Sequence, residues 1–588
     1  MTTNALPLRE RKPEAELEDW VSVEAPIISG TTPTPASAPA LVEPIVDRIT
    51  RTQADLKELL AFYKIETSPI QYDRLQEFYD EELESLKDVP FKIYTQDEKV
   101  DYLLLKAQLS RARQTLELER ARDEEIGPLF EPFAASIKGW IGARMRVEPV
   151  DPRDVATEFH GLLDEVTRCK GVAERSGPEK YSKPTGYRAV KRISQLREHL
   201  KEMYDFYDGY EPLWDWWVRK PYAALDTALG ALASSIEENV VGIGSGDEDT
   251  IIGQPIRRDG LLAELKAEMI PYTPEELIRV AEKEYAWCES EMIKASKELG
   301  FGKDWHEALE HVKGLTEAPG SQPLFIKSLV DEGTAYVKKH DLVTVPKVAE
   351  EAIRMVMIPP SQQKVSPFFL GGPVLYVSYP TSDMSHSDKM MSMRGNNRHF
   401  SKATAFHEMI PGHHLQLFVA ERSNPHRQVF QTPFYVEGWA LYWELLLWSR
   451  GDFFTSPEDR VGTLFWRMHR CARIIFSLKF HLGQMTPSEC VDLLVNWVGH
   501  ERANAEGEVR RSFNGDYSPL YQAGYLLGAL QIWALRSEAV DQGLMPEKEF
   551  HDRILKANMM PIEMVRALLL DQELSQDFES RWKFYGDI

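Results

Sequence analysis

The stretch TAFHEMIPGHHLQLFVAER, residues 404–422, carries the strongest signal for a fold and a function. It nearly reproduces the motif H-E-x-x-H, in which two histidines one helical turn apart bind a single metal ion. His407 and Glu408 match its first half, but Pro411 stands where the second histidine belongs. Because proline cannot continue the hydrogen-bond ladder of a helix and Gly412 relaxes the backbone, we predict a kink or bulge here.

Two histidines compete for the second position. If two residues are looped out, His413 takes the place of the missing histidine. His414 follows His407 by seven residues, which returns it to the same face of an unbroken helix but about 10 Å along the axis. That separation is too large for one metal ion unless the helix is broken. We favour His413 and keep His414 as the alternative.

The next apolar segment, FYVEGWALYWELL, supplies further carboxylates. Its Glu437 follows His413 by 24 residues, and a glutamate on the following helix is the usual third ligand of such zinc sites. Glu444 lies seven residues further on the same helix face, where it could orient a ligand histidine or be a solvated charge. We predict the metal ligands His407, His413 and Glu437.

The predicted chemistry is hydrolysis assisted by a divalent metal. Glu408 would act as the general base that takes a proton from water and returns it to a leaving amine. Zn²⁺ is the ion expected from two imidazoles and a carboxylate, although another divalent metal is compatible with the same ligands.

Composition excludes several classes of protein. The chain has 588 residues and a net charge of −23, the wrong sign for binding nucleic acid or anionic lipid. Its N-terminus has no apolar signal region, and its most apolar run, WALYWELLLW, is too short to span a bilayer. Four scattered cysteines indicate reduced thiols. We therefore expect a cytoplasmic protein without nucleic-acid or membrane partners; its oligomeric state is not predicted.

Helical periodicity dominates the organisation of the chain. Residues 1–45 are rich in Pro, Thr, Ser and Ala and are predicted to be a disordered tail. A mainly α fold is expected beyond it, with one small sheet just before the histidines, in VLYVSY at residues 374–379. We predict an N-terminal helical region, 46–345, and a catalytic region, 346–588, packed together around one large cleft.

Two helix starts can be recognised from their capping residues. Thr273 and Thr486 are each followed by a proline and then, at the third position, by a glutamate, Glu276 and Glu489. This pattern predicts a capping box. The first of these helices should end near Gly300.

The segments HEMIPGHHLQ and EGWALYWE together resemble the zincin-like family labelled domain of unknown function 885, which is related in outline to helical gluzincin peptidases. The resemblance is strongest over residues 365–540. It implies a helical zincin-like metallohydrolase with its small sheet beside the active-site helix. The motif residues that match are His407, Glu408, Pro411, Gly412, His413, His414, Gln416, Glu437, Gly438, Trp439, Tyr442 and Glu444.

Two later segments extend the resemblance. In RCARIIFSLKFH, Arg473 and His481 match the family, while Ser477 replaces an expected acid. YSPLYQAGYLLGALQIWALR resembles the family's late helix. Related peptidases donate a hydrogen bond to the oxyanion from a distant helix, which makes Tyr525 the candidate donor. The alternative is that Tyr521 and Tyr525 are only packed aromatic residues.

Substrate contacts are predicted at two further places. Arg510 and Arg511 could hold a substrate carboxylate or be ordinary surface arginines, and the strand around Tyr376 could pair with an extended substrate. The function expected is a zinc-dependent hydrolase of peptide or amide bonds, specifically a carboxypeptidase- or dipeptidase-like metallopeptidase on short peptides. The alternatives are a metal-dependent amidohydrolase or amide-forming enzyme on a small metabolite, and an inactive zincin used as a binding scaffold.

Overall fold

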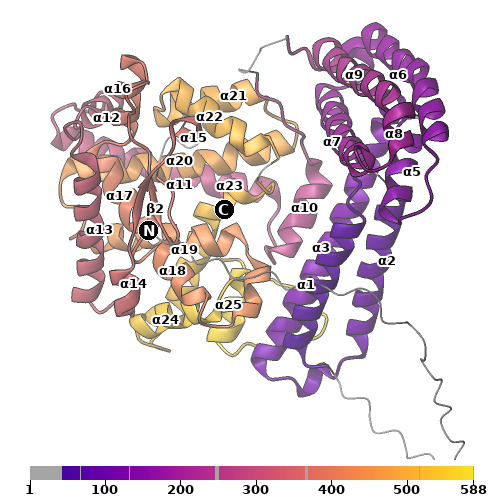
Figure 1. The fold of residues 1–588 in the computed structure, drawn as a ribbon. Helices are drawn as coiled ribbons and strands as arrows, with labels where there is room; N and C mark the ends of the chain where they lie inside the picture. Colours follow the sequence, from indigo (N-terminus) through magenta and orange to yellow (C-terminus); the bar gives the residue numbers. More distant parts are fainter. Residues whose placement is uncertain are drawn as a thin grey trace, which may run out of the picture. The chain divides into compact units, whose positions relative to one another are not determined.

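Helices dominate the computed structural model, which describes residues 43–586 except 67, 132, 245–249, 364–368 and 516 (Figure 1). The tail predicted for residues 1–45 lies outside the described residues apart from its last three. From Pro44 onward the chain forms one compact unit. The mainly α class is confirmed, and so is a small sheet before the histidines. The division predicted at residue 345 stays a prediction.

The first half of the described chain consists of helices joined by short turns. Their bounds are α1 Ile45–Phe62, α2 Pro69–Ser85, α3 Gln96–Glu125, α4 Gly127–Phe130, α5 Phe133–Met145, α6 Pro152–Lys180, α7 Lys183–Tyr207, α8 Pro212–Trp217, α9 Arg219–Ile236, α10 Arg257–Ala267, α11 Pro274–Glu298, α12 Trp305–Lys313 and α13 Gln322–Lys339.

The second half adds the two strands and the remaining helices. Their bounds are α14 Lys347–Glu351, β1 Met355–Met357, α15 Pro360–Gln363, β2 Leu375–Val377, α16 His386–Gly395, α17 Arg398–Glu408, α18 His413–Ala420, α19 Pro433–Arg450, α20 Pro457–His481, α21 Pro487–Leu493, α22 Arg502–Phe513, α23 Tyr521–Arg536, α24 Glu547–Ala557 and α25 Ile562–Leu569. None of the helices in the described part of the chain combines the length and apolar character needed to cross a bilayer.

Both predicted capping boxes are confirmed. The hydroxyl of Thr273 accepts a hydrogen bond from the N–H of Glu276, whose carboxylate accepts one from the N–H of Thr273. Thr486 and Glu489 repeat the arrangement at the start of α21. These reciprocal bonds satisfy backbone donors that a helix leaves unpaired at its N-terminus.

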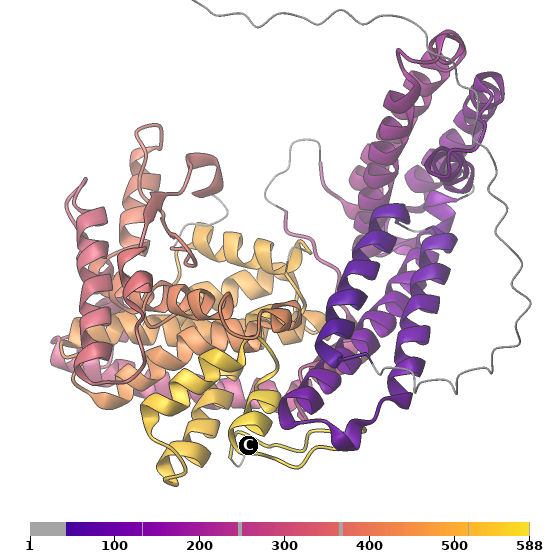
Figure 2. The ribbon, with the colours of Figure 1, turned by 60° about the horizontal axis from the view of Figure 1, so that its bottom comes forward.

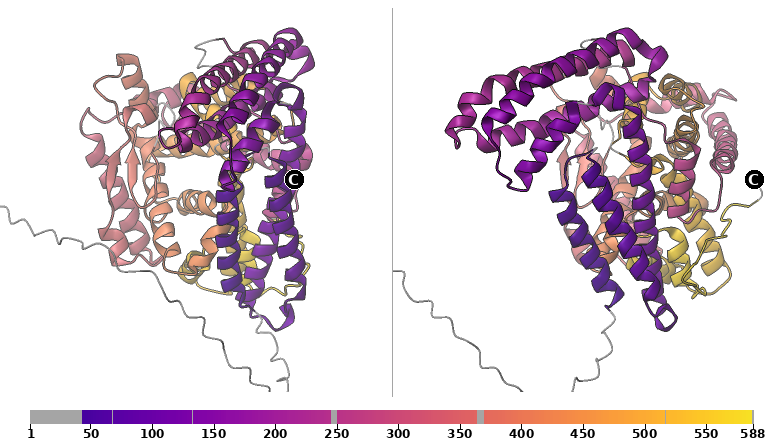
Figure 3. Two further views of the ribbon diagram at one scale, coloured as in Figure 1. Left: turned by 45° about the vertical axis from the view of Figure 1, so that its right-hand side comes forward. Right: turned by 90° about the vertical axis from the view of Figure 1, so that its right-hand side faces the viewer.

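Buried apolar side chains gather in two large clusters. One unites residues of α3, α11, α19, α20 and α23. The other is formed mainly by α5, α6, α7 and α9, and α6 and α7 both pack against α9 (Figures 2 and 3). Helix α20 is buried along almost its whole length. Because it packs against α11, α17 and α23, it is the central element beneath the histidine motif.

The sheet is small and parallel. Met355 pairs with Leu375 and Met357 with Val377, so β2 is shorter than the predicted strand. An antiparallel bridge joins Tyr376 to Leu370, through Leu370 N–H to Tyr376 O at 3.0 Å and Tyr376 N–H to Leu370 O at 2.8 Å. The buried faces of Leu375 and Val377 pack with residues of α13 and α17. The sheet therefore anchors residues 369–371 beside the C-terminal end of α17.

Helices α19 and α23 approach each other unusually closely. A Cβ atom at Gly438 would lie 2.7 Å from the Cα of Gly528, and one at Gly528 would overlap the carbonyl oxygen of Phe434. Only glycine lets the two backbones meet at this distance. The contact places Tyr521 and Tyr525, on α23, next to Glu437 on α19.

Replacing Gly528 by alanine should destabilise the protein by several kcal/mol, because the added methyl group collides with backbone rather than with a movable side chain. A matched control is Gly161→Ala in α6, where a Cβ meets nothing within 4 Å; that change should be neutral or stabilising by about 0.5–1 kcal/mol. Denaturant unfolding of both variants measures the difference. Equal stability of the two would show that the helices can separate without cost.

The start of α19 is held by a buried glutamate. Thr432 accepts a hydrogen bond from the N–H of Phe434 and donates its hydroxyl to Glu268 Oε2 at 2.6 Å. Glu268 is 4% exposed, and burial raises its pKa to about 7. The folded protein therefore prefers this carboxyl protonated, and its contribution to stability is present below pH 4.5 and lost as the pH rises through 7.

Glu268→Gln should accordingly gain stability relative to wild type between pH 5 and pH 8, because glutamine keeps an acceptor for Thr432 without the buried charge. The full gain is about 3 kcal/mol. Melting temperatures of both proteins across this range provide the measurement. A difference that does not change with pH would contradict the assignment of Glu268 as the titrating group.

Candidate metal centre

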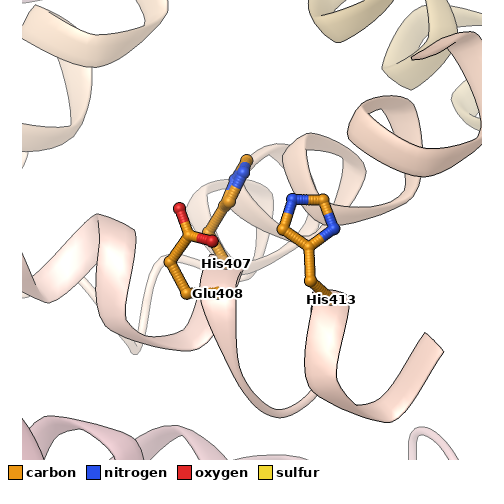
Figure 4. A group of neighbouring side chains, drawn as sticks. All are labelled: His407, Glu408 and His413. Atoms are coloured by element: carbon orange, nitrogen blue, oxygen red, sulfur yellow. The ribbon is translucent and has the colours of Figure 1, made fainter. Parts of the chain in front are cut away.

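The histidine helix is interrupted where the sequence predicts. Helix α17 ends at Glu408 and α18 begins at His413, with a loop through Pro411 between them (Figure 4). A Cβ atom at Gly412 would overlap the carbonyl group of His407, so the loop can close only with glycine at this position. Breaking the helix brings His413 beside His407, with their ring centroids 4.9 Å apart.

Glu437 faces both imidazoles with the same oxygen atom. Its Oε2 lies 3.2 Å from His413 Nε2 and 3.7 Å from His407 Nε2. Tetrahedral coordination at bond lengths near 2.0–2.2 Å separates ligand atoms by roughly 3.3 Å. One ligand atom each from His407, Glu408 and His413 also lie within 4.8 Å of one another. The donor set and its spacing therefore fit a divalent metal ion.

The other oxygen of Glu437 is already bonded. Its Oε1 accepts a hydrogen bond of 2.6 Å from the hydroxyl of Tyr521. Burial alone would raise the pKa of Glu437, but the charges and hydrogen bonds of His413 and His407 hold it well below its usual range. The carboxylate is thus ionised, and one of its two oxygens is directed at the histidines.

His407 is oriented from its other nitrogen. Its Nδ1 lies 2.8 Å from Glu444 Oε1, which also accepts a hydrogen bond from Arg470 Nη2 at 3.2 Å. Burial would lower the pKa of His407, yet hydrogen bonds to Glu437 and Glu444 raise it to about 9. Glu444 is 2% exposed and is therefore not a solvated charge. A carboxylate behind a histidine is the usual support of a metal ligand.

The two adjacent histidines have different surroundings. His413 Nε2 points to Glu437, while its Nδ1 lies 3.5 Å from Gln416 Oε1. Both ring nitrogens of His414 instead face backbone carbonyl oxygens, Nδ1 that of Gly372 at 3.0 Å and Nε2 that of Ala349 at 2.8 Å. His414 has no nitrogen left for a metal, so the geometry favours His413.

Glu408 lies against the segment anchored by the sheet. A Cβ atom at Gly371 would overlap its carboxylate, so glycine is what lets residues 369–371 cover this side of the site. Burial raises the pKa of Glu408, and the charges of His407 and His413 oppose that shift. A carboxylate with a raised pKa is a stronger base once it is ionised.

His407, Glu408, His413 and Glu437 line a cavity of about 270 Å³. It is lined by Phe369, Leu370, Gly371, Thr404, His407, Glu408, His413, Leu417, Gln431, Val436, Glu437, Trp466, His469, Arg470, Arg473, Arg511, Tyr517, Tyr521 and Tyr525. The ring of Tyr525 lies nearly parallel to that of His407, with centroids 6.5 Å apart. The predicted ligands, the base and the candidate oxyanion donor therefore meet in one place.

Three other predicted residues do not line this cavity. His481 accepts a hydrogen bond from the N–H of Ile256, and burial lowers its pKa to about 3. Arg510 donates to the carbonyl of Thr250 at 3.5 Å. The main chain of Tyr376 is bonded to Leu370, and β2 pairs with β1 on its other edge. That strand therefore offers no free main-chain groups to a substrate at Tyr376.

Sequence reasoning missed part of the site. It named Tyr521 only in the alternative that Tyr521 and Tyr525 are packed aromatic residues, whereas the hydroxyl of Tyr521 bonds Glu437. It did not single out Arg470, which supports Glu444, or His469 in the cavity wall. The spacing of Arg470 and Arg473 on one helix was the available signal, but only the packing of α20 against α23 shows which face they occupy.

The chain belongs to the family described as bacterial protein of unknown function (DUF885), whose profile matches residues 65–569. A protein from Shewanella oneidensis described as a lipoprotein of unknown function shares its fold, with a TM-score of 0.65, 17% identity and coverage of 90% of this chain and 99% of that one. One from Colwellia psychrerythraea, also described as a lipoprotein, has a TM-score of 0.56, 15% identity and coverage of 90% and 97%. No curated protein matches the chain.

Tyr521→Phe should weaken zinc binding about 10-fold or more, because it removes the hydrogen bond that fixes Glu437. Tyr435→Phe is the matched control: this buried tyrosine of α19 bonds the carbonyl of Ile554 instead and should bind zinc like wild type. Competition with a chromophoric chelator gives both affinities. An unchanged affinity in Tyr521→Phe would remove Tyr521 from the support of the site.

Proposed function

We propose that this protein is a zincin-like, zinc-dependent hydrolase of peptide or amide bonds that acts on short peptides. The observation that carries the proposal is the convergence of His407 Nε2 and His413 Nε2 on one oxygen of Glu437, beside the carboxylate of Glu408. Two imidazoles and a carboxylate form the ligand set of a hydrolytic zinc site that keeps one position open.

His407, His413 and Glu437 would hold a divalent ion, which would polarise water and a substrate carbonyl. Glu408 takes the proton of the attacking water on its carboxylate and passes it to the nitrogen of the leaving amine. The hydroxyl of Tyr525 donates to the oxygen of the carbonyl under attack. Tyr521 and Glu444 keep Glu437 and His407 in their orientations.

The substrate must be small where it enters the site. The cavity of about 270 Å³ lies just under the usual range of small-molecule pockets, which is about 300–1,000 Å³. It suits the end of a short peptide rather than a folded protein. A carboxypeptidase- or dipeptidase-like activity is the form of hydrolysis that this space favours. The cytoplasmic location expected from composition stays a prediction.

Glu408→Gln should keep its zinc and lose turnover by at least about 10²–10³-fold, because the amide cannot accept the proton of water. Wild type and variant are compared on dipeptides, blocked peptides and acyl-amines, with products followed by mass spectrometry and zinc by elemental analysis. Glu421→Gln, which replaces an exposed glutamate paired with Arg422, should behave as wild type.

Chelation should abolish the wild-type activity, and added zinc should restore it. The proposal would be contradicted by a Glu408→Gln variant as active as wild type, or by a purified protein that takes up no divalent metal. Cleavage of acyl-amines without cleavage of any peptide would instead identify an amidohydrolase of small metabolites.

A further inference from the structure

A cluster of arginines lies in the cavity wall next to the metal centre. Arg470 and Arg473 come from α20 and Arg511 from α22, and all three line the cavity. Arg470 and Arg473 are each 5% exposed. Removing a guanidinium group from water is costly unless it is paired, so three of them in one wall need an explanation.

A single carboxylate pairs with two of these arginines. Arg473 Nε donates to Glu508 Oε1 at 2.6 Å, and Arg511 Nε lies 2.8 Å from Glu508 Oε2. Burial would raise the pKa of Glu508, but the charges of Arg473 and Arg511 lower it to about 2. Glu508 thus hydrogen-bonds Arg473 and forms an ion pair with Arg511, whose buried Nε has no partner in hydrogen-bond geometry among the described residues.

The third arginine is only partly satisfied. Its Nη2 donates to Glu444 Oε1, while the Nε and Nη1 atoms of Arg470 are buried and have no hydrogen-bond partner among the described residues. A buried donor without a partner is destabilising, and more so when it is charged. The wall of the cavity thus retains unused donors.

The local charge is unbalanced. Among the described residues, the three guanidinium groups are paired with two carboxylates, Glu444 and Glu508. His469, also in the wall, is neutral because burial and the neighbouring arginines lower its pKa well below its usual value. The carboxylates of Glu408 and Glu437 face the metal site instead. The arginine side of the cavity therefore lacks one negative charge.

Tyr525 connects this cluster to the metal ligands. Its ring lies 4.4 Å from Arg473 Cζ and stacks at 6.5 Å on the ring of His407. One aromatic side chain thus contacts both groups. An anion bound by the arginines would therefore share one cavity with a bond held between His407, His413 and Glu408.

We infer that the cluster of Arg470, Arg473 and Arg511 binds a free carboxylate of the substrate, so that the substrates are short peptides or acyl-amino acids with an unblocked carboxyl end. A planar guanidinium group matches a carboxylate with two parallel hydrogen bonds. This inference rests on the proposed function and deepens it: cleavage takes place next to the carboxyl terminus. Of Arg510 and Arg511, which the sequence offered as carboxylate-binding residues, Arg511 lines the cavity and Arg510 does not. Arg473 is therefore the second arginine of the proposed carboxylate site.

The test measures binding rather than turnover. Benzoyl-glycyl-phenylalanine and its C-terminal amide are titrated by calorimetry into the full-length Glu408→Gln variant supplied with zinc, so that neither probe is consumed. The acid should bind at least about 10-fold more tightly than the amide, as expected for a buried charge-assisted pair. Adding Arg473→Gln or Arg511→Gln should reduce this ratio to near one.

Arg467→Gln is the matched control. Arg467 is also on α20 but pairs with Glu284 and stacks on Trp287, outside the cavity, so its loss should leave the ratio unchanged. Circular dichroism verifies folding of each variant. If Arg473→Gln does not fold, Arg511→Gln decides, because Glu508 then keeps Arg473 as its partner.

Equal binding of acid and amide, no binding of either probe, or a preference that survives both substitutions would overturn the inference. The outcome is independent of hydrolysis. A preference that depends on the arginines in a protein without any peptidase activity would leave the carboxylate site standing and reject the proposed function. Hydrolysis of both probes by wild type with equal kcat/KM would support the proposed function and reject the carboxylate site.

Discussion

The candidate metal centre depends on the close contact between α19 and α23. Where Gly438 meets Gly528, no side chain separates the two backbones. Glu437 and Tyr521 are carried to within hydrogen-bond distance as a direct result. A larger residue at either glycine would move the carboxylate of Glu437 away from the two imidazoles. Backbone packing therefore sets the position of Glu437 relative to the two imidazoles, and rotation of side chains cannot compensate for a change in that packing.

Helix α20 supplies charged side chains to the wall of the cavity. It is surrounded by other helices, yet it presents arginines toward the cavity. Each of these charges is tied to a carboxylate on another helix, Arg470 to Glu444 on α19 and Arg473 to Glu508 on α22. Breaking such a buried pair costs about 3–5 kcal/mol. The same bonds that keep the helices together therefore orient His407 on one side and the arginine cluster on the other.

Much of the candidate centre could be read from spacing alone. Pro411 and Gly412 predict the broken helix, and the structure begins a new helix at His413. The distance from His413 to Glu437 along the chain predicts their contact. Both capping boxes form as expected. These predictions succeed because each depends on local backbone chemistry or on two neighbouring helices.

Predictions that needed the packing of distant segments were weaker. Arg510 and Arg511 are adjacent in sequence, but successive residues of a helix point in different directions, and only Arg511 lines the cavity. His481 shares α20 with Arg473, yet it lies near Ile256 instead. The sequence by itself determined the histidine motif, its interruption and the helical class, because those follow from residue type and short spacing. The tertiary structure alone decided that Tyr521 bonds Glu437 and that three arginines share a wall, because both follow from which faces of α20, α22 and α23 are buried together.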